Sequence, residues 1–551
     1  MIKIDAGEYR LHLYYLKREI VAMATLWYGG NIYTLIEEGH QVEAVLTMDN
    51  RIIATGSLEE IERKYNDDIK VKMNLEGSTM LPGFVDSHLH LIGHGEKLIR
   101  LDLTNYSSKL DVLEAVRQCA EKTNQGEWII GEGWNENLWD EPVPIVLDEI
   151  DKVAPNHPVL LKRVCRHAIV VNSLAISNAG LLEDQEYDLE GVIEKDEAGC
   201  FNGIFKEKAQ DLILKVIPEA SVDFIKKALR AAIQDAHKKG LTGVHTEDLA
   251  YYNGFEETYK IFKDVIEEEG FAIRAHLLVH HKVMNDFKNS DGRFLKGNDW
   301  VEFGAVKIFT DGSLGGRTAL LSRPYADDPS TNGVAIFSQQ ELNNLVARAR
   351  ELNMTVAIHA IGDRASEMSL TAIELNPLRG EGKDRLIHAQ ILRKDLIERI
   401  KRLPIILDIQ PTFVASDFPW VIERIGEENM DYCYAWKTLI KEDIPCAGGS
   451  DAPVEEISPL LGIHAAVNRM DKLGKVHFPK ESLSVYDAVC LYTKGSAKAA
   501  NHEQDRGMIK AGHLSDFTII RENIFECATE AIKDISVVKT VIGGKVVYKS
   551  A

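Results

Sequence analysis

Short apolar segments with the pattern of β-strands alternate with amphipathic helical stretches through the middle of this chain, and this alternation most limits the folds open to it. Alternating strand and helix patterns indicate βα units and a parallel sheet. Eight strands are predicted, over residues 83–90, 241–246, 271–279, 303–312, 354–360, 384–390, 404–411 and 444–451. Eight βα units close into a barrel, so we expect an α/β protein with a (β/α)₈ TIM barrel.

Far more chain separates the first two predicted strands than the roughly 30 residues of one βα repeat. We therefore expect an insert at about 100–240, which is a candidate cap over the active site. The stretch SVDFIKKALRAAIQDAHKKG before the second strand has helical spacing, with Ser221 as its N-cap and Gly240 as its end.

Both ends of the chain contain short β-rich runs separated by turn residues. The turn MDNR near the start and the pair Gly543-Gly544 near the end fit β-hairpins. We predict one composite β-sandwich from residues 23–83 and 505–551, with two unrelated edge elements as the alternative. The barrel and its insert then span residues 84–504. Residues 1–22 are expected to be an arm without functional weight, which need not belong to the native protein.

Composition excludes several classes of protein. The 551 residues include 64 Lys and Arg against 85 Asp and Glu, a net charge of -21. This charge opposes binding to nucleic acid or anionic lipid, because both need a basic patch. No apolar run approaches the roughly 20 residues of a membrane span, and the first residues lack the pattern of a signal peptide. Seven single cysteines without a C-x-x-C pair are typical of a reducing compartment, so we expect a cytoplasmic protein.

The strongest local motif is Asp86-Ser87-His88-Leu89-His90, at the end of the first predicted strand. Because side chains alternate along a strand, Asp86, His88 and His90 face one side. Two imidazoles at the C-terminal end of a barrel strand can converge on one transition-metal ion. A single His-x-His motif is weak evidence for a metal site, so the prediction depends on whether the other strands also end in residues that can bind a metal ion.

The fourth strand carries Lys307 on the same face as Ala305, Phe309 and Asp311. A lysine on an inward face is costly to bury unless something compensates it. A desolvated amine could react with carbon dioxide and form a carbamate whose two oxygens bridge two metal ions. The alternative is a lysine that snorkels or pairs with Asp311.

Three more residues with metal-binding side chains follow at the ends of later strands: His359 on the fifth, His388 on the sixth and Asp451 on the eighth. The two histidines are one βα repeat apart, and Asp451 comes two repeats later. A lone histidine near a strand is usually structural. Six such residues at the ends of strands one, four, five, six and eight instead predict one site at the C-terminal face of the barrel.

The ordered set SHLH, AVKIF, AIHA, LIHA and GGSDAP resembles the metal-dependent amidohydrolase superfamily, over essentially the whole chain from Met23. The segments FTDGSLGGRTALLSRPY, HAIGD, CRHAIVVNSLAI and GEGWNENLW are similar to amidohydrolase family 3, a subgroup that includes N-substituted formamide deformylases. This resemblance implies two divalent metal ions. It implies that His88, His90 and Asp451 hold one ion, that His359 and His388 hold the other, and that carboxylated Lys307 bridges them.

The residues and the resemblance together predict hydrolysis of a C–N bond in a non-peptide amide such as an N-substituted formamide, with an ester or lactone left open. Two divalent ions, expected to be Zn²⁺, would hold a bridging water as hydroxide at neutral pH. Asp451 would take its proton during attack and deliver it to the leaving group. A metal ion would also polarise the substrate carbonyl and stabilise the oxyanion.

Weaker candidates for substrate binding are Arg317 after strand four, and Trp134 and His167 in the insert. Each has a structural alternative: a loop salt bridge for Arg317, the core of the insert for Trp134, and a contact within the insert for His167. Four further histidines lie on or near strands but do not match the ligand positions of the family; they are His245, His276, His280 and His281.

Two other functions stay open. A mononuclear nucleobase aminohydrolase, or deaminase, typically lacks the strand-four lysine and has a glutamate where this chain has Gly362. A non-catalytic scaffold without metal is the alternative from another class, and the presence of all six ligand positions disfavours it. The expected partner is a small-molecule substrate. A homo-oligomer is compatible with the sequence, which leaves the oligomeric state, the native metal and the substrate open.

Overall fold

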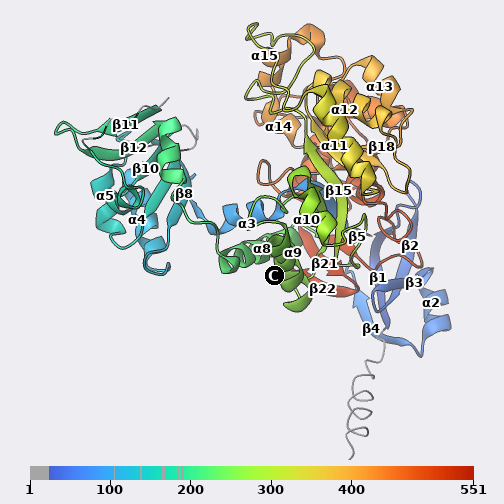
Figure 1. The fold of residues 1–551 in the computed structure, drawn as a ribbon. Helices are drawn as coiled ribbons and strands as arrows, with labels where there is room; N and C mark the ends of the chain where they lie inside the picture. Colours follow the sequence, from blue (N-terminus) through green and yellow to red (C-terminus); the bar gives the residue numbers. More distant parts are fainter. Residues whose placement is uncertain are drawn as a thin grey trace, which may run out of the picture. The chain divides into compact units, whose positions relative to one another are not determined.

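The structure is a computed structural model that describes residues 24–550 apart from 105, 137, 138, 140, 164–167, 184, 186 and 188–190. The predicted arm at 1–22 lies outside the described residues. The chain forms two compact units, one from residues up to Leu91 and from Ile233 onward, the other from Ile92 to Ala232. Each unit has its own sheets and helices (Figure 1).

The larger unit contains a nearly closed barrel of parallel strands. The hydrogen-bonded order is β19-β18-β17-β16-β15-β14-β13-β6. The strands are β6 (Phe84–Leu89), β13 (Leu241–Thr246), β14 (Arg274–His280), β15 (Val301–Phe309), β16 (Val356–Ala360), β17 (Asp384–His388), β18 (Ile405–Ile409) and β19 (Cys446–Gly448). Each falls within or beside one of the eight predicted segments, so the predicted TIM barrel is confirmed.

The backbone closes the barrel just beyond the ends of β6 and β19. The N–H of Asp451 donates to the carbonyl of His88 at 2.8 Å, and the N–H of His90 donates to the carbonyl of Ala452 at 2.8 Å. Gly449 permits this approach, because a Cβ there would lie 2.7 Å from the nitrogen of His88. The C-terminal ends of the first and eighth strands therefore meet.

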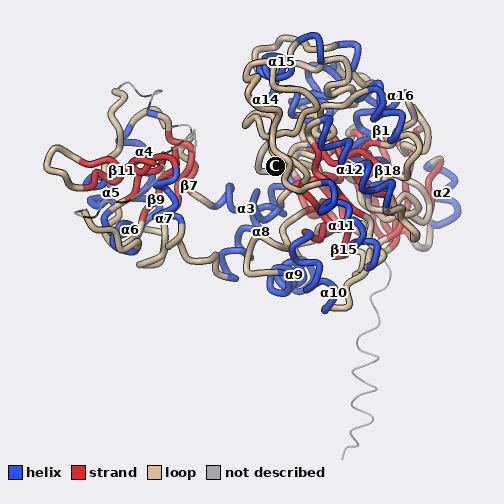
Figure 2. Tube along the Cα trace, turned by 45° about the horizontal axis from the view of Figure 1, so that its top comes forward, coloured by secondary structure: helices blue, strands red, loops and turns tan. Residues whose placement is uncertain are grey.

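Helices surround the strands of the barrel, as Figure 2 shows. Helix α8 (Val222–Lys238) begins where Ser221 accepts a hydrogen bond from the N–H of Phe224 at 3.2 Å and ends before Gly240 at φ +84, as predicted. Helix α8 runs across the chain boundary between the two units at Ala232. The helices that belong wholly to the larger unit are α2 (Leu58–Tyr65), α9 (Phe255–Lys263), α10 (Met284–Asn289), α11 (Gln339–Glu351), α12 (Asp363–Leu375), α13 (Lys394–Ile400), α14 (Phe413–Asp417), α15 (Trp420–Ile425), α16 (Trp436–Lys441), α17 (Pro459–Asn468), α18 (Val485–Cys490) and α19 (Ser496–Ala499).

Strands from both ends of the chain form one eight-stranded sheet in the larger unit (Figure 1). Its order is β22-β21-β20-β5-β1-β2-β3, with β4 paired to β1. Both predicted hairpins are present: Asp49 and Asn50 join β2 to β3, and Gly543 and Gly544 join β21 to β22. The strands are β1 (Ala24–Tyr33), β2 (Gln41–Met48), β3 (Arg51–Gly56), β4 (Ile69–Asn74), β5 (Thr79–Pro82), β20 (Phe517–Ile520), β21 (Val537–Ile542) and β22 (Lys545–Lys549). Trp27 and Phe517 share its buried core, so the two termini fold together.

The smaller unit is the insert between strands β6 and β13. Its sheet has the order β11-β12-β10-β9-β8-β7. The strands are β7 (Leu101–Asp102), β8 (Ile129–Trp134), β9 (Val159–Arg163), β10 (Ala168–Val171), β11 (Gly191–Lys195) and β12 (Phe201–Glu207), and the helices are α3 (Leu91–Ile99), α4 (Lys109–Ala120), α5 (Leu147–Val153), α6 (Ser173–Asn178) and α7 (Asp211–Leu214). Its role as a cap stays a prediction. Among all described residues, no helix is long and apolar enough to cross a membrane.

Candidate metal centre

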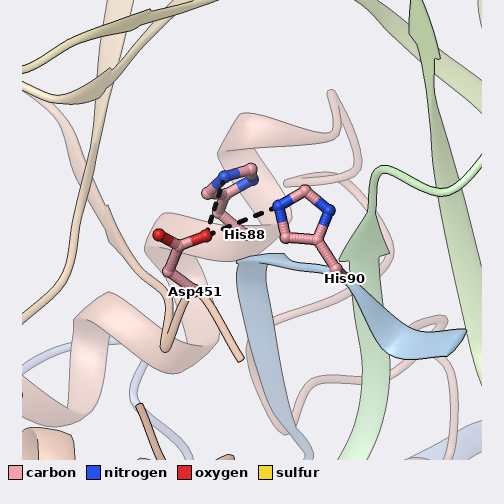
Figure 3. A group of neighbouring side chains, drawn as sticks. All are labelled: His88, His90 and Asp451. Atoms are coloured by element: carbon pink, nitrogen blue, oxygen red, sulfur yellow. Dashed lines mark ion pairs between the residues drawn. The ribbon is translucent and has the colours of Figure 1, made fainter. Parts of the chain in front are cut away.

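His88, His90 and Asp451 converge where strands β6 and β19 end. The Oδ1 atom of Asp451 lies 3.4 Å from Nε2 of His88 and 3.7 Å from Nε2 of His90 (Figure 3). One ligand atom from each residue lies within 4.8 Å of the others, as three ligands of a single ion require. Two imidazoles and one carboxylate form a donor set that suits Zn²⁺. The side chains present therefore fit a metal ion.

Asp86 fixes the turn that carries Asp451. Its carboxylate accepts the N–H of Ser450 at 3.1 Å and the N–H of His88 at 3.1 Å, so one side chain holds both halves of the site. Burial raises the pKa of Asp86 to about 7. Asp451 itself adopts φ 57, in the left-handed region that non-glycine residues seldom occupy. Such conformations persist where the surrounding structure enforces them, often at functional sites.

Lys307 lies beside this trio. Its side chain is fully buried, and Nζ lies 3.1 Å from Nε2 of His88. Burial lowers the pKa of Lys307, which favours the neutral amine. Pairing with Asp311 is absent among the described residues, because that carboxylate instead accepts the N–H groups of Leu320, Ile361 and Gly362.

His359 and His388, the predicted ligands of a second ion, lie at the ends of β16 and β17. Their ring centroids are 4.5 Å apart, and the ring of His388 lies 5.7 Å from that of His88. Nε2 of His359 lies 3.1 Å from the carbonyl of Gly312, and Nδ1 of His388 lies 2.7 Å from Oε1 of Gln410. These contacts leave Nδ1 of His359 and Nε2 of His388 available for a ligand.

Burial keeps the imidazoles of the site neutral. It lowers the pKa of His90 to about 4 and that of His359 to about 3, and it lowers the pKa values of His88 and His388 well below their ordinary value. Neutral imidazole is the form that binds a metal ion, so the rings are ready to coordinate near pH 7. The structure thus brings all six predicted ligand residues together at the C-terminal face of the barrel.

Two supporting residues were missed in the sequence. Gln410 follows β18 and contacts His388, while Glu247 follows β13 and its carbonyl lies 2.8 Å from Nδ1 of His90. Both residues come directly after barrel strands, at the face where active sites lie. That position alone could have identified them.

The weaker candidates have structural contacts of their own. Arg317 forms an ion pair with Asp327 at 2.8 Å. Trp134 is buried in the core of the insert, where its indole N–H donates to the carbonyl of Leu161 at 3.3 Å. These contacts match the structural alternatives, and substrate binding by either residue stays a prediction. His167 lies outside the described residues.

The four lower-ranked histidines divide into two pairs. His280, the last residue of β14, and His281 stack with ring centroids 4.3 Å apart. His245 and His276 line a separate cavity of about 30 Å³. Nδ1 of His276 lies 2.9 Å from the carboxylate of Glu302, which also lies 2.7 Å from His502. This second pair belongs to a buried network that includes none of the six predicted ligands.

Comparison with known proteins identifies the family. A model of the amidohydrolase family matches residues 72–548. The chain belongs to the amidohydrolase family. This amidohydrolase is 47% identical over 532 residues to the amidohydrolase-family protein YtcJ of Bacillus subtilis, which covers 96% of this chain and 100% of that protein. It is 25% identical over 537 residues to an N-substituted formamide deformylase of Arthrobacter pascens, covering 95% of this chain and 97% of that enzyme.

A solved structure supports the same assignment. The crystal structure of an uncharacterized metal-dependent hydrolase of Pyrococcus furiosus matches with a TM-score of 0.78 and 29% identity, over 91% of this chain and 100% of that one. The amidohydrolase is therefore a metal-dependent hydrolase that acts on C–N bonds.

Proposed function

We propose that this amidohydrolase cleaves the C–N bond of a non-peptide amide such as an N-substituted formamide, at a centre of two divalent metal ions. The convergence of His88, His90 and Asp451, with donor atoms within 4.8 Å of one another, carries the proposal. The similarity to an N-substituted formamide deformylase suggests the class of substrate.

The six residues would divide between two ions. His88, His90 and Asp451 would hold one ion, His359 and His388 would hold the other, and Lys307 would bridge them as a carbamate. Divalent ions there, for which we propose Zn²⁺, supply Lewis acidity toward a carbonyl and lower the pKa of water. The distance of 3.1 Å between Nζ of Lys307 and Nε2 of His88 supports the proposal that both side chains would bind the same ion.

Asp451 would carry the proton. Burial raises the pKa of Asp451, so its carboxylate can accept a proton near neutral pH. An amide nitrogen must be protonated before it can leave, and Asp451 would deliver that proton. Asp86, through the N–H of Ser450, would hold the carboxylate of Asp451 in position while it accepts the proton of the attacking water and while it delivers that proton to the leaving nitrogen.

This chain lacks the glutamate that a nucleobase deaminase has three residues after the fifth-strand histidine. Position 362 is glycine, and even a Cβ there would lie 1.9 Å from the carbonyl oxygen of Leu320. A glutamate therefore has no room at this point of the barrel without movement of the loop. This observation favours the amide hydrolase over the nucleobase deaminase.

A substrate panel tests the proposal. Zn²⁺-reconstituted protein is assayed against N-substituted formamides, the N-acetyl forms of the same amines, and nucleobases. We expect formamide hydrolysis that His88→Ala and His359→Ala abolish, while His40→Ala, which alters a loop of the terminal sheet, keeps the wild-type rate. Deamination of a nucleobase would favour the mononuclear enzyme, and no hydrolysis of any amide would favour the scaffold.

A further inference from the structure

Glu247, the first residue after β13, has a buried carboxyl group beside the side chain of Tyr251. Its side chain is 0% exposed, and Tyr251 is its hydrogen-bonding neighbour. A buried carboxyl group with so little polar contact is destabilising, because it loses water and gains little in return. Such a residue persists where function needs it. The mechanism above gives Glu247 no role.

Residues around Glu247 form hydrogen bonds with the segment that carries His90. The N–H of Glu247 donates to the carbonyl of Leu89 at 3.1 Å, and the N–H of Leu91 donates to Oγ1 of Thr246 at 2.8 Å. The same N–H of Leu91 lies 3.1 Å from Oδ2 of Asp248. The three consecutive residues 246–248 therefore hold both neighbours of His90 in place.

The carboxylate of Glu247 lies at the outer nitrogen of the His90 ring. Oε2 is 3.8 Å from Nδ1, while the carbonyl oxygen of Glu247 is 2.8 Å from the same nitrogen. Nε2, on the opposite side of the ring, faces Asp451. The ring of Tyr251 packs against His90 with centroids 5.8 Å apart. His90 is thus held between Glu247 on one side and the predicted metal position on the other.

We propose that Glu247 is a positioning residue for the metal ligand His90. Its carbonyl accepts the Nδ1 proton in this structure, and its carboxylate would move in to accept that proton as well when an ion is bound. The inference rests on the proposed metal centre. An imidazole that binds a cation through Nε2 becomes a stronger donor at Nδ1, and a charged acceptor then binds that proton better than a carbonyl alone. A movement of about 1 Å brings Oε2 from 3.8 Å to hydrogen-bonding distance.

The substitution Glu247→Gln separates this role from a merely structural one. It keeps the shape of the side chain and removes its charge. We expect the affinity of metal-stripped protein for Zn²⁺, measured by competition with a chelator, to fall about 10- to 100-fold. The visible spectrum of Co²⁺-substituted protein is expected to change, because the donor strength of His90 changes. The midpoint of thermal unfolding without metal should change little, since glutamine keeps the volume of the side chain and burial, which raises the pKa of Glu247 to about 8, already disfavours its charged form.

Glu302→Gln is the matched control, because Glu302 is also a buried carboxylate beside a histidine, His276, but touches no predicted ligand. Its Zn²⁺ affinity should equal that of the wild type. If Glu247→Gln fails to fold, Glu247→Asp carries the test and should bind Zn²⁺ more weakly than the wild type. Unchanged affinity and an unchanged Co²⁺ spectrum in the folded Glu247 variant would overturn the inference while leaving the metal centre intact. A wild-type protein that binds no metal would overturn both.

Discussion

Replacing Gly362 with alanine tests how closely the loop after β15 packs against the start of α12. A Cβ at this position would lie 1.9 Å from the carbonyl oxygen of Leu320, and contacts below 3.0 Å do not occur without movement. The backbone of Gly362 has φ -77, which any residue can adopt, so the contact alone would cause the effect.

The cost follows from what must move. Relief of the contact needs a shift of about 1 Å in a loop whose hydrogen bonds are short. The N–H groups of Gly362 and Leu320 both donate to Asp311, at 2.9 and 2.8 Å. Overpacking of a buried site costs about 1–3 kcal/mol, and one weakened buried hydrogen bond costs about 1 kcal/mol. We expect Gly362→Ala to lower the free energy of unfolding by about 2–4 kcal/mol.

Urea denaturation of the metal-free protein measures this loss. Gly380→Ala is the control, since among the described residues, its chain neighbours aside, no heavy atom lies within 4 Å of a Cβ there and its φ is ordinary. That variant should stay within about 0.5 kcal/mol of the wild type. If Gly362→Ala were equally harmless, the close packing that excludes a side chain at 362 would be refuted.

Three other variants test separate parts of the molecule. Asp451→Asn should keep the fold and metal-free stability but lose orders of magnitude in kcat, and a near-normal kcat would remove Asp451 as the proton carrier. Burial opposes ionisation of Glu302, but hydrogen bonds from His276 and His502 outweigh it and lower the pKa of Glu302 from 4.5 to about 2. The lowered pKa contributes about 3 kcal/mol to the free energy of unfolding above pH 4.5, and this contribution is lost as the pH falls toward 2. Glu302→Gln should therefore flatten the plot of unfolding free energy against pH between about pH 4.5 and 2. An unaltered plot would contradict the pairing of Glu302 with the two histidines. Trp134→Ala should destabilise the insert by about 3–5 kcal/mol in thermal unfolding, because the indole is buried in its core, and an unchanged transition would contradict that placement.

Local pattern was sufficient to predict the barrel. Apolar strands and amphipathic helices alternate regularly, and the two hairpins carry turn residues at the required places. The six predicted ligands could be found because each lies near or just beyond the C-terminal end of a strand, and these ends meet at one face of a barrel. Asp451 and His88 are far apart in sequence, but their strands are neighbours in the closed barrel.

Other features depend on contacts that no local pattern encodes. The place of Glu247 directly after a barrel strand could have marked it as a candidate, but its burial beside His90 is a tertiary contact that the sequence does not show. The close approach of Leu320 to Gly362 is likewise a tertiary contact. A tryptophan such as Trp134 suits a core as well as a binding surface, and Arg317 suits an ion pair as well as a substrate. The chain pattern could not separate these alternatives.

The metal content of the purified protein, with and without Lys307, tests the binuclear centre most directly. Protein is prepared without chelator in the presence of bicarbonate, and zinc and other divalent metals are measured by elemental analysis beside the Lys307→Ala variant. We predict close to two metal ions per chain in the wild type and loss of metal in the variant, because Lys307 is buried 3.1 Å from Nε2 of His88. One ion that persists in Lys307→Ala, or no metal in either protein after reconstitution, would contradict a lysine-bridged pair of ions.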